Sequence, residues 1–334
     1  MVLAFSLKKG ALPSNIQRNM MNASERGKMQ KETNQYLIDE INRLKKEKGA
    51  IILVHNYQRP EIYRVADFIG DSYGLSHEAS ATKTRMIIFC GVHFMAESAS
   101  ILNPDKKVII PVIDAGCPMA DMVKAEDLRK LKKKHPDAAV VCYINTTAEI
   151  KAESDIVCTS SNAVKIVNSL PQQRIIFVPD ENLADYVAGY TDKEIIPWNG
   201  YCYVHTKFSP EELAKSKKLR GDAKVIAHPE CPAGVRALAD HICSTSGMIG
   251  YAKQSDAKEF IIATEMGMIE MLRLQVPGKI FYSAPPGSTC VNMKKTNLRL
   301  VLEALENEAP IITVPEKIRL KAKEALDRMI EAAK

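Results

Sequence analysis

The chain has 334 residues, with 46 Lys and Arg against 40 Asp and Glu and 46% apolar residues. This length suffices for two or three domains that each bury a core, and the composition is typical of a folded, soluble protein. No apolar run approaches the roughly 18 residues that a membrane-spanning helix needs. The opening MVLAFSL is too short for a signal peptide. We therefore expect a cytoplasmic protein with no membrane partner.

The net charge of +6 is concentrated near the N-terminus. Residues 1–34 hold six Lys and Arg and two Glu, which is +4 of the total. We expect these residues to form a basic, disordered tail, which explains the charge without a polyanion. Because no basic segment is interleaved with aromatic residues, no nucleic-acid partner is expected.

A helix is predicted over residues 35–48, with Gly49 as its end cap. Short, continuously apolar runs follow and alternate with amphipathic stretches, a pattern typical of parallel strands covered by helices on both faces. The nine runs form three groups, at 50–57, 85–91 and 107–113; at 138–146, 155–161 and 174–180; and at 223–230, 259–265 and 279–285. Two further helices are expected at about 296–308 and 315–332.

The spacing of the runs favours a triplicated unit. The second and third runs of the groups start 22, 19 and 20 residues apart. His55, Tyr143 and His228, at the ends of the first runs, are 88 and 85 residues apart. We predict an α/β fold of three analogous three-layer αβα domains with parallel sheets around a pseudo-threefold axis; one doubly wound sheet is the alternative. The predicted domains are 35–115 (with residues 296–334 packing back on it), 116–200 and 201–295.

Polar side chains follow many of the runs, and open α/β sheets bind ligands beyond the carboxyl ends of their strands. If the three units face one axis, these side chains line one central cavity. For each histidine, a purely structural hydrogen-bonded role is the alternative. The polar segments are His55 to Tyr57, Tyr143 to Asn145, His228 to Glu230, Thr159 to Ser161, and Thr264 with Glu265.

Eight cysteines occur, without a Cys-x-x-Cys pair, so a zinc ribbon or a clustered ferredoxin motif is disfavoured. Cys117, Cys202 and Cys290 each lie beyond the last run of a group and are 85 and 88 residues apart, close to the repeat spacing. Three thiolates from three units would suit an iron–sulfur cluster with one iron left without a protein ligand.

The other cysteines are assigned differently. Cys231-Pro232 offers the same local chemistry as Cys117-Pro118, a thiol before a helix start, and only position in the repeat favours Cys117. Three others lie inside predicted strands and are expected to be inert core residues; they are Cys90, Cys142 and Cys158. Cys243 lies near a predicted helix end, and its role is left open.

Seven segments in order resemble the quinolinate synthase family, over residues of about 37 to 332. They are ILVHNYQRPE (52–61), ADFIGDS (66–72), GCPMAD (116–121), CYINTTAE (142–149), CTSSNAV (158–164), AHPECP (227–232) and CVNMKK (290–295). The resemblance implies three αβα domains with the active site where they meet. It also implies a [4Fe-4S] cluster held by Cys117, Cys202 and Cys290, whose open iron acts as a Lewis acid.

The resemblance implies the reaction as well. Members of this family condense iminoaspartate with dihydroxyacetone phosphate to quinolinate, with loss of phosphate and water, in NAD biosynthesis. A functional link to an aspartate-oxidising enzyme follows, because iminoaspartate is unstable. The implied catalytic residues are Tyr57, Glu230, His228 and Asp71. The implied substrate-binding residues are His55, Ser72, Tyr143, Ile144, Asn145, Ser160, His228, Pro229, Glu230 and Thr245.

The sequence departs from the family pattern beside one of the three cysteines. Tyr203 follows Cys202 where the family pattern has Pro, which puts the local backbone in question.

Two other classes of protein are alternatives to the enzyme. A zinc hydrolase could use His228, Glu230 and Cys231 as metal ligands or base, but the three spaced cysteines would then have no function. A non-catalytic iron–sulfur carrier would use the cysteines but not the polar strand ends.

Overall fold

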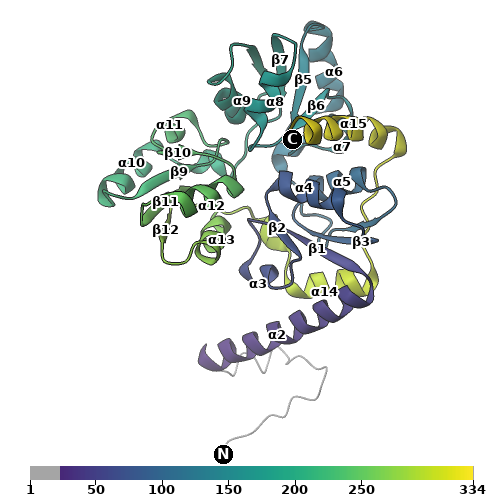
Figure 1. The fold of residues 1–334 in the computed structure, drawn as a ribbon, viewed down its shortest axis with the longest axis vertical. Coiled ribbons are helices and arrows are strands. Elements are labelled where there is room, and N and C mark those ends of the chain that lie inside the picture. The colour runs from purple at the N-terminus through teal and green to yellow at the C-terminus, as the bar shows by residue number, and fades with distance from the viewer. Residues whose placement is uncertain (1–22, 334) are drawn as a thin grey trace, which may run out of the picture.

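The computed structural model describes residues 23–333. They form three lobes that meet near the middle of the molecule, each built on a four-stranded parallel sheet with helices on both faces (Figure 1). The predicted fold class, three αβα units with parallel sheets, is confirmed. The exact domain boundaries stay a prediction.

The first unit has the strand order β2-β1-β3-β4. Successive residues of its central strands face two different cores, one under α4 and α5 and one under α2 and α14, which explains the continuously apolar runs. The elements are β1 (Ala50–His55), α3 (Pro60–Tyr63), β2 (Phe68–Gly70), α4 (Ser72–Ala81), β3 (Met86–Cys90), α5 (His93–Leu102) and β4 (Lys107–Ile109).

The second unit repeats this order as β6-β5-β7-β8. Helix α6 covers one face of the sheet, and α8 and α9 cover the other. The elements are η1 (Pro118–Met122), α6 (Ala125–Lys134), β5 (Ala139–Tyr143), α7 (Ala148–Ala152), β6 (Ile156–Cys158), α8 (Ala163–Ser169), β7 (Arg174–Val178), α9 (Glu181–Ala188) and β8 (Glu194–Pro197).

The third unit has the order β10-β9-β11-β12. Helices α10 and α11 cover one face, and α12 and α13 cover the other. The elements are η2 (His205–Lys207), α10 (Pro210–Leu219), β9 (Lys224–Ala227), α11 (Ala233–Arg236), β10 (His241–Ile242), α12 (Thr245–Gln254), β11 (Glu259–Ala263), α13 (Gly267–Gln275), β12 (Ile280–Ser283) and η3 (Met293–Lys295).

The triplication is real, but its predicted alignment in the second unit is wrong. Each unit has four strands, and the sequence runs missed β2, β8 and β10. The run at 155–161 contains β6, an edge strand equivalent to β2 and β10, rather than the counterpart of β3 and β11. The true counterpart of β3 is β7. The misalignment also explains why the first two runs of the middle group start only 17 residues apart, against 35 and 36 in the other two groups.

Two helices differ from expectation. Helix α2 (Ala23–Glu47) begins at Ala23, so residues 23–34 are helical rather than part of a disordered tail; residues 1–22 lie outside the described part of the chain. This segment consists largely of helix-forming residues, and side-chain pairs such as Gln30–Asn34 at 2.8 Å extend the helix. The expected end cap is confirmed, because Gly49 adopts a left-handed φ of +60°.

The C-terminal helices separate. Helix α14 (Leu298–Asn307) packs on α2 and β3 of the first unit, as expected. Helix α15 (Glu316–Ala333) instead packs mainly on α7, β6 and α8 of the second unit, beside the teal lobe of Figure 1. Its buried face, which includes Leu326 and Met329, completes a core shared by the first and second units. Helix α15 also packs on α5 of the first unit, so the expectation that both helices pack back on the first unit holds for α14 and only in part for α15.

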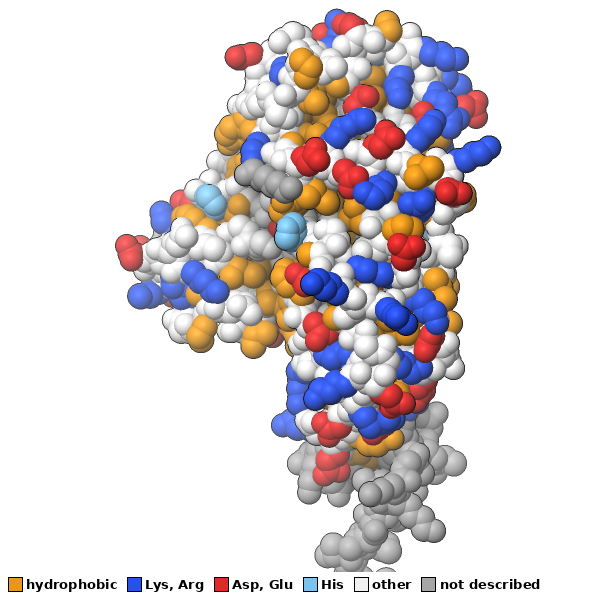
Figure 2. Space-filling model, turned by 45° about the vertical axis from the view of Figure 1, so that its right-hand side comes forward, with side chains coloured by type: hydrophobic (Ala, Val, Ile, Leu, Met, Phe, Trp, Pro, Cys, Tyr) orange, Lys and Arg blue, Asp and Glu red, His pale blue; other side chains and the backbone are white. Residues whose placement is uncertain are grey.

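The surface carries both signs of charge. On the face drawn in Figure 2, the basic and acidic side chains of the described residues are interspersed. None of the helices within residues 23–333 combines the length and apolar character needed to cross a membrane.

Candidate active site

A pocket lies at the junction of the three units and is lined by residues from all of them. Most side chains predicted for the site line it, namely His55, Tyr57, Asp71, Ser72, Cys117, Tyr143, Asn145, Ser160, Cys202, His228, Glu230, Thr245 and Cys290. Ile144 and Pro229 do not. Ile144 is only 1% exposed and belongs to the apolar core.

The pocket contains two sets of three equivalent positions on the scaffold. His55, Tyr143 and His228 lie at or just after the ends of the central strands β1, β5 and β9. Three hydroxyl residues follow the edge strands β2, β6 and β10; they are Ser72, Ser160 and Thr245. Because strands of a parallel sheet end at the same edge, the repeat brings both sets to one cavity.

The two strand-end histidines are oriented in the same way. His55 Nδ1 accepts the backbone N–H of Tyr57 at 3.1 Å, and His228 Nδ1 accepts that of Glu230 at 3.3 Å. Burial, with the nearby charge of Lys294, lowers the pKa of His55 to about 3, and burial also lowers the pKa of His228. Both rings are therefore neutral at pH 7, and each presents Nε2–H as a donor. His228 Nε2 lies 3.2 Å from Ser160 Oγ.

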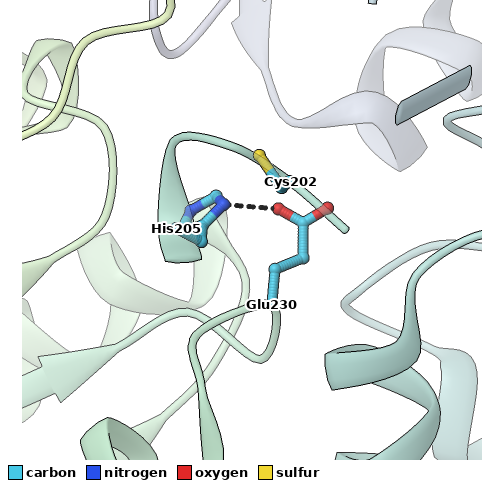
Figure 3. Close-up of side chains that lie close together, drawn as sticks. All are labelled: Cys202, His205 and Glu230. Carbon is cyan, nitrogen blue, oxygen red and sulfur yellow. Dashed lines mark ion pairs between the residues drawn. The ribbon is translucent and has the colours of Figure 1, made fainter. Parts of the chain in front are cut away.

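A continuous series of polar contacts joins Tyr57 to Glu230. Tyr57 Oη lies 2.6 Å from Thr264 Oγ1, which lies 2.8 Å from His205 Nε2. His205 Nδ1 lies 2.7 Å from Glu230 Oε2, the ion pair drawn in Figure 3. All four side chains are wholly or largely buried. The two residues expected to do acid–base chemistry are thus linked through two that were not assigned a role.

The environment holds these two residues in opposite protonation states. Burial raises the pKa of the Tyr57 hydroxyl well above 10, so Tyr57 is a proton donor at neutral pH. Burial alone would raise the pKa of Glu230 too, but the adjacent His205 outweighs it and brings the pKa below its usual range. Glu230 is therefore a carboxylate, and its second oxygen, Oε1, is buried without a partner among the described residues.

The three cysteines of the repeat reach the pocket from three loops. Cys117 follows β4 and begins η1, Cys202 follows β8, and Cys290 follows β12. Burial raises the pKa of all three thiols, that of Cys117 to about 12. Uncharged thiols are therefore the stable state until a cation binds them. As a donor set, three convergent cysteines fit a thiophilic metal or cluster.

Two hydrogen bonds fix the cysteine loops relative to one another. Asn292 Nδ2 donates to the carbonyl of Gly116 at 2.8 Å. The backbone N–H of Val291 donates to Tyr203 Oη at 3.1 Å. Tyr203, where the family pattern has Pro, thus joins the Cys202 loop to the Cys290 loop.

The remaining cysteines lie elsewhere. Cys231 is buried outside the pocket and its Sγ donates to the carbonyl of Ala263 at 3.2 Å. It is therefore not brought together with His228 and Glu230 as a zinc hydrolase would require. The three expected to be inert are buried in or at the end of strands; they are Cys90, Cys142 and Cys158.

A different group, Cys202, His205 and Glu230, has its ligand atoms within 4.8 Å of one another (Figure 3). Two ligands of a tetrahedral zinc ion, with bonds of about 2.0–2.1 Å, lie about 3.3 Å apart. The 2.7 Å between His205 Nδ1 and Glu230 Oε2 is shorter than this and is the distance of a close ion pair. The group thus belongs to the polar series, with Cys202 at its edge.

Asp71 has structural partners. Its Oδ1 accepts the N–H of Gly74 at 2.9 Å and caps α4, and its Oδ2 accepts the hydroxyl of Ser244 at 3.3 Å. Beside it, Asn56 Nδ2 donates to Thr245 Oγ1 at 2.9 Å. These bonds join the first and third units along one wall of the pocket.

Sequence reasoning missed His205 and gave Thr264 no role. His205 lies three residues after Cys202 in the turn η2, which is the only local sign of its importance. Thr264 follows the central strand β11, and only the folded third unit brings it to His205.

The fold and the pocket define an α/β protein of three repeated units with one buried, thiol-bearing acid–base site where the units meet. The family model described as quinolinate synthetase A protein matches residues 39–331. Quinolinate synthase of Methanosarcina barkeri is 55% identical over 294 residues, 88% of this chain and 97% of the relative. That of Geobacter metallireducens is 55% identical over 291 residues, 87% of this chain and 96% of the relative. The chain belongs to the quinolinate synthetase A family of enzymes.

Proposed function

We propose that the chain condenses iminoaspartate with dihydroxyacetone phosphate to quinolinate, releasing phosphate and water, as a step of NAD biosynthesis. The observation that carries this proposal is the meeting of three cysteines, each of which follows the last strand of a sheet, with the series from Tyr57 to Glu230 in one pocket. A carrier protein would need the cysteines but not a buried tyrosine and carboxylate held in opposite protonation states.

The cofactor is proposed to be a [4Fe-4S] cluster held by Cys117, Cys202 and Cys290. Three protein thiolates leave one iron of such a cluster without a protein ligand. When bound, the cluster would supply a Lewis-acidic iron to substrate. The partly buried, uncharged thiols and the hydrogen-bonded loops suit a site that forms thiolates only on loading.

The chain's own residues provide acid–base chemistry. Enamine formation from the imine removes a proton from carbon, and Glu230, with its free Oε1 in the pocket, is the proposed base. Tyr57 is the proposed acid for a departing or carbonyl oxygen. Thr264 accepts from Tyr57 and donates to His205 Nε2, and Nδ1 of the same ring faces Glu230 Oε2. This series orients the Tyr57 hydroxyl.

The substrates carry carboxylates and a phosphate, and the pocket offers donors for them. We assign Ser72, Ser160 and Thr245 as hydroxyl donors, and His55 and His228 as Nε2–H donors. Asn145 contributes an Oδ1 atom that is buried without a partner among the described residues, and so awaits a donor from the ligand. Asp71, Tyr143, Ile144 and Pro229 are proposed to have the roles that the family resemblance implies, the last two through their backbone atoms.

A cytoplasmic location and a functional link to an aspartate-oxidising enzyme complete the proposal. Because iminoaspartate hydrolyses readily, the enzyme that forms it has to act close in time to this one.

The proposal is tested on protein purified without oxygen, by measuring iron and sulfide per chain and quinolinate formed from the two substrates. About four irons per chain together with product are expected. Four irons without product would favour a carrier or a related dehydratase. Failure to bind iron after anaerobic reconstitution would contradict the cysteine assignment.

A further inference from the structure

Glu265, directly after Thr264, is fully buried yet does not line the pocket. Its carboxylate accepts the backbone N–H of Gly267 at 2.6 Å and that of Cys290 at 3.2 Å. The second of these bonds reaches one of the three proposed cluster ligands. The Glu265 carboxylate therefore holds the backbone of the Cys290 loop directly.

Lys294 completes the arrangement. Its ammonium lies 3.2 Å from the Glu265 carboxylate and also donates to the main-chain carbonyl of Tyr57. The backbone carbonyl of Lys294 accepts from Arg59 Nε at 2.8 Å, so the same residue is bound to the Tyr57 loop from two sides. The pair therefore connects the Cys290 loop of the third unit with the Tyr57 loop of the first.

The backbone beside this pair leaves no room for a side chain. A Cβ atom added at Gly267 would lie 2.4 Å from Lys294 Nζ and 2.6 Å from Glu265 Oε2, so the glycine is what allows the ion pair to sit against the backbone. The carboxylate and the ammonium each have several fixed partners, which is the condition under which a buried ion pair holds one geometry.

We propose that Glu265 and Lys294 are positioning residues that place Cys290 and Tyr57 relative to each other across the unit boundary. Neither contacts the pocket. The proposal rests on the proposed function for the roles of Cys290 and Tyr57. Glu265 acts through the Cys290 backbone, and Lys294 acts through the Tyr57 carbonyl and through Glu265.

The first test concerns Cys290 and needs no substrate. Full-length protein is freed of iron with a chelator and treated with iodoacetamide, and the alkylation rates of Cys290 and Cys117 are compared by mass spectrometry. Glu265→Gln is expected to raise the rate at Cys290 about tenfold, the order of loss seen for outer-shell partners of ligands, and to leave Cys117 unchanged. Equal increases at both cysteines, or no change at Cys290, would overturn the proposal.

A charge control and a double variant accompany this test. Glu270→Gln neutralises an exposed carboxylate of the same unit, which pairs with Arg273 at 2.7 Å, and should leave both rates unchanged. If Glu265→Gln does not fold because Lys294 is left unpaired, the double variant Glu265→Gln with Lys294→Met removes both charges. The same selective rise at Cys290 is expected from it.

The second test concerns Tyr57. Lys294→Met is expected to lower kcat about tenfold with KM unchanged, and Lys294→Arg, which keeps a cationic donor, to recover most of the loss. Lys295→Met is the control, since that lysine pairs with exposed Asp114 at 2.9 Å. Unchanged kcat in Lys294→Met, or an equal loss in Lys295→Met, would contradict the positioning role. If the wild-type protein forms no quinolinate, the proposed function fails, while the alkylation result still decides the role of Glu265.

Discussion

The carboxylate of Asp240 accepts a hydrogen bond at 2.8 Å from the backbone N–H of Val225, which lies 15 residues earlier at the centre of β9. Asp155 makes the same bond to Val140 at 2.7 Å, and Asp67 makes it to Ile52 at 2.8 Å. The backbone N–H of each aspartate returns a bond to the same strand residue. These aspartates are 88 and 85 residues apart, so the structure supplies a mark of triplication independent of the pocket.

The Asp240 bond predicts a pH dependence of stability. Burial alone would raise its pKa, but the Val225 N–H, Lys217 and Lys224 outweigh it and lower the pKa. A carboxyl group whose pKa is lowered in the fold adds stability above its ordinary value of 3.8, and this stability is lost as pH falls through the folded pKa. Asp240→Asn should therefore be less stable than wild type in urea unfolding at neutral pH. The difference should vanish in acid, and a constant difference would contradict the assignment.

The cysteine assignment predicts a sharp division among buried thiols. Cys117→Ala, Cys202→Ala and Cys290→Ala should each lose the bound iron, because each removes one of three ligands. Cys142→Ala is the matched control, since Cys142 is buried in β5 away from the pocket. Iron and sulfide analysis after anaerobic purification checks this. Full iron in any of the first three would remove that cysteine from the ligand set.

Removing the hydroxyl of Thr264 is expected to lower activity without changing the volume of the side chain. Thr264→Val keeps the side-chain volume but removes the contacts to Tyr57 and His205. We expect kcat to fall roughly ten- to hundredfold, because an unoriented acid loses part of its catalytic contribution. Thr264→Ser keeps the hydroxyl and should retain most activity. Equal activity in the Val and Ser variants, measured as quinolinate formation, would show that the hydroxyl is not used.

Glu230→Gln separates chemistry from cofactor binding. The amide fills the same space but cannot accept a proton from carbon, so kcat is expected to fall by about 10²- to 10⁴-fold with iron content unchanged. Quinolinate formation and iron per chain are measured on the same sample. Near-normal turnover would exclude Glu230 as the base.

The packing of α15 predicts that truncating one of its buried side chains destabilises the protein. Leu326 is fully buried in the core shared by the first and second units. Leu326→Ala should lower the free energy of unfolding by about 2–5 kcal/mol, because the cavity cannot fully close. Leu320→Ala, on the same helix but 50% exposed, is the control and should change stability little. Equal effects of the two changes in urea unfolding would contradict the packing.

Much of the architecture could be predicted because the central strands are buried on both faces and leave apolar runs in the sequence. The missing strands β2, β8 and β10 have two to four residues and are largely half-exposed, so they leave no such run. Ser72 and Thr245 follow β2 and β10, which is why they came only from the family resemblance and not from the strand pattern. His205 could not be assigned from sequence, because its role depends on Thr264, 59 residues away.

The three loops that carry cysteine have kept the same chemistry in all three units, whereas the strand ends have diverged to His55, Tyr143 and His228. A cluster is close to symmetric and accepts identical ligands from three directions. The proposed substrates differ from each other, and their reaction has a direction. The three units thus present identical side chains to the proposed cluster and different side chains to the proposed substrates.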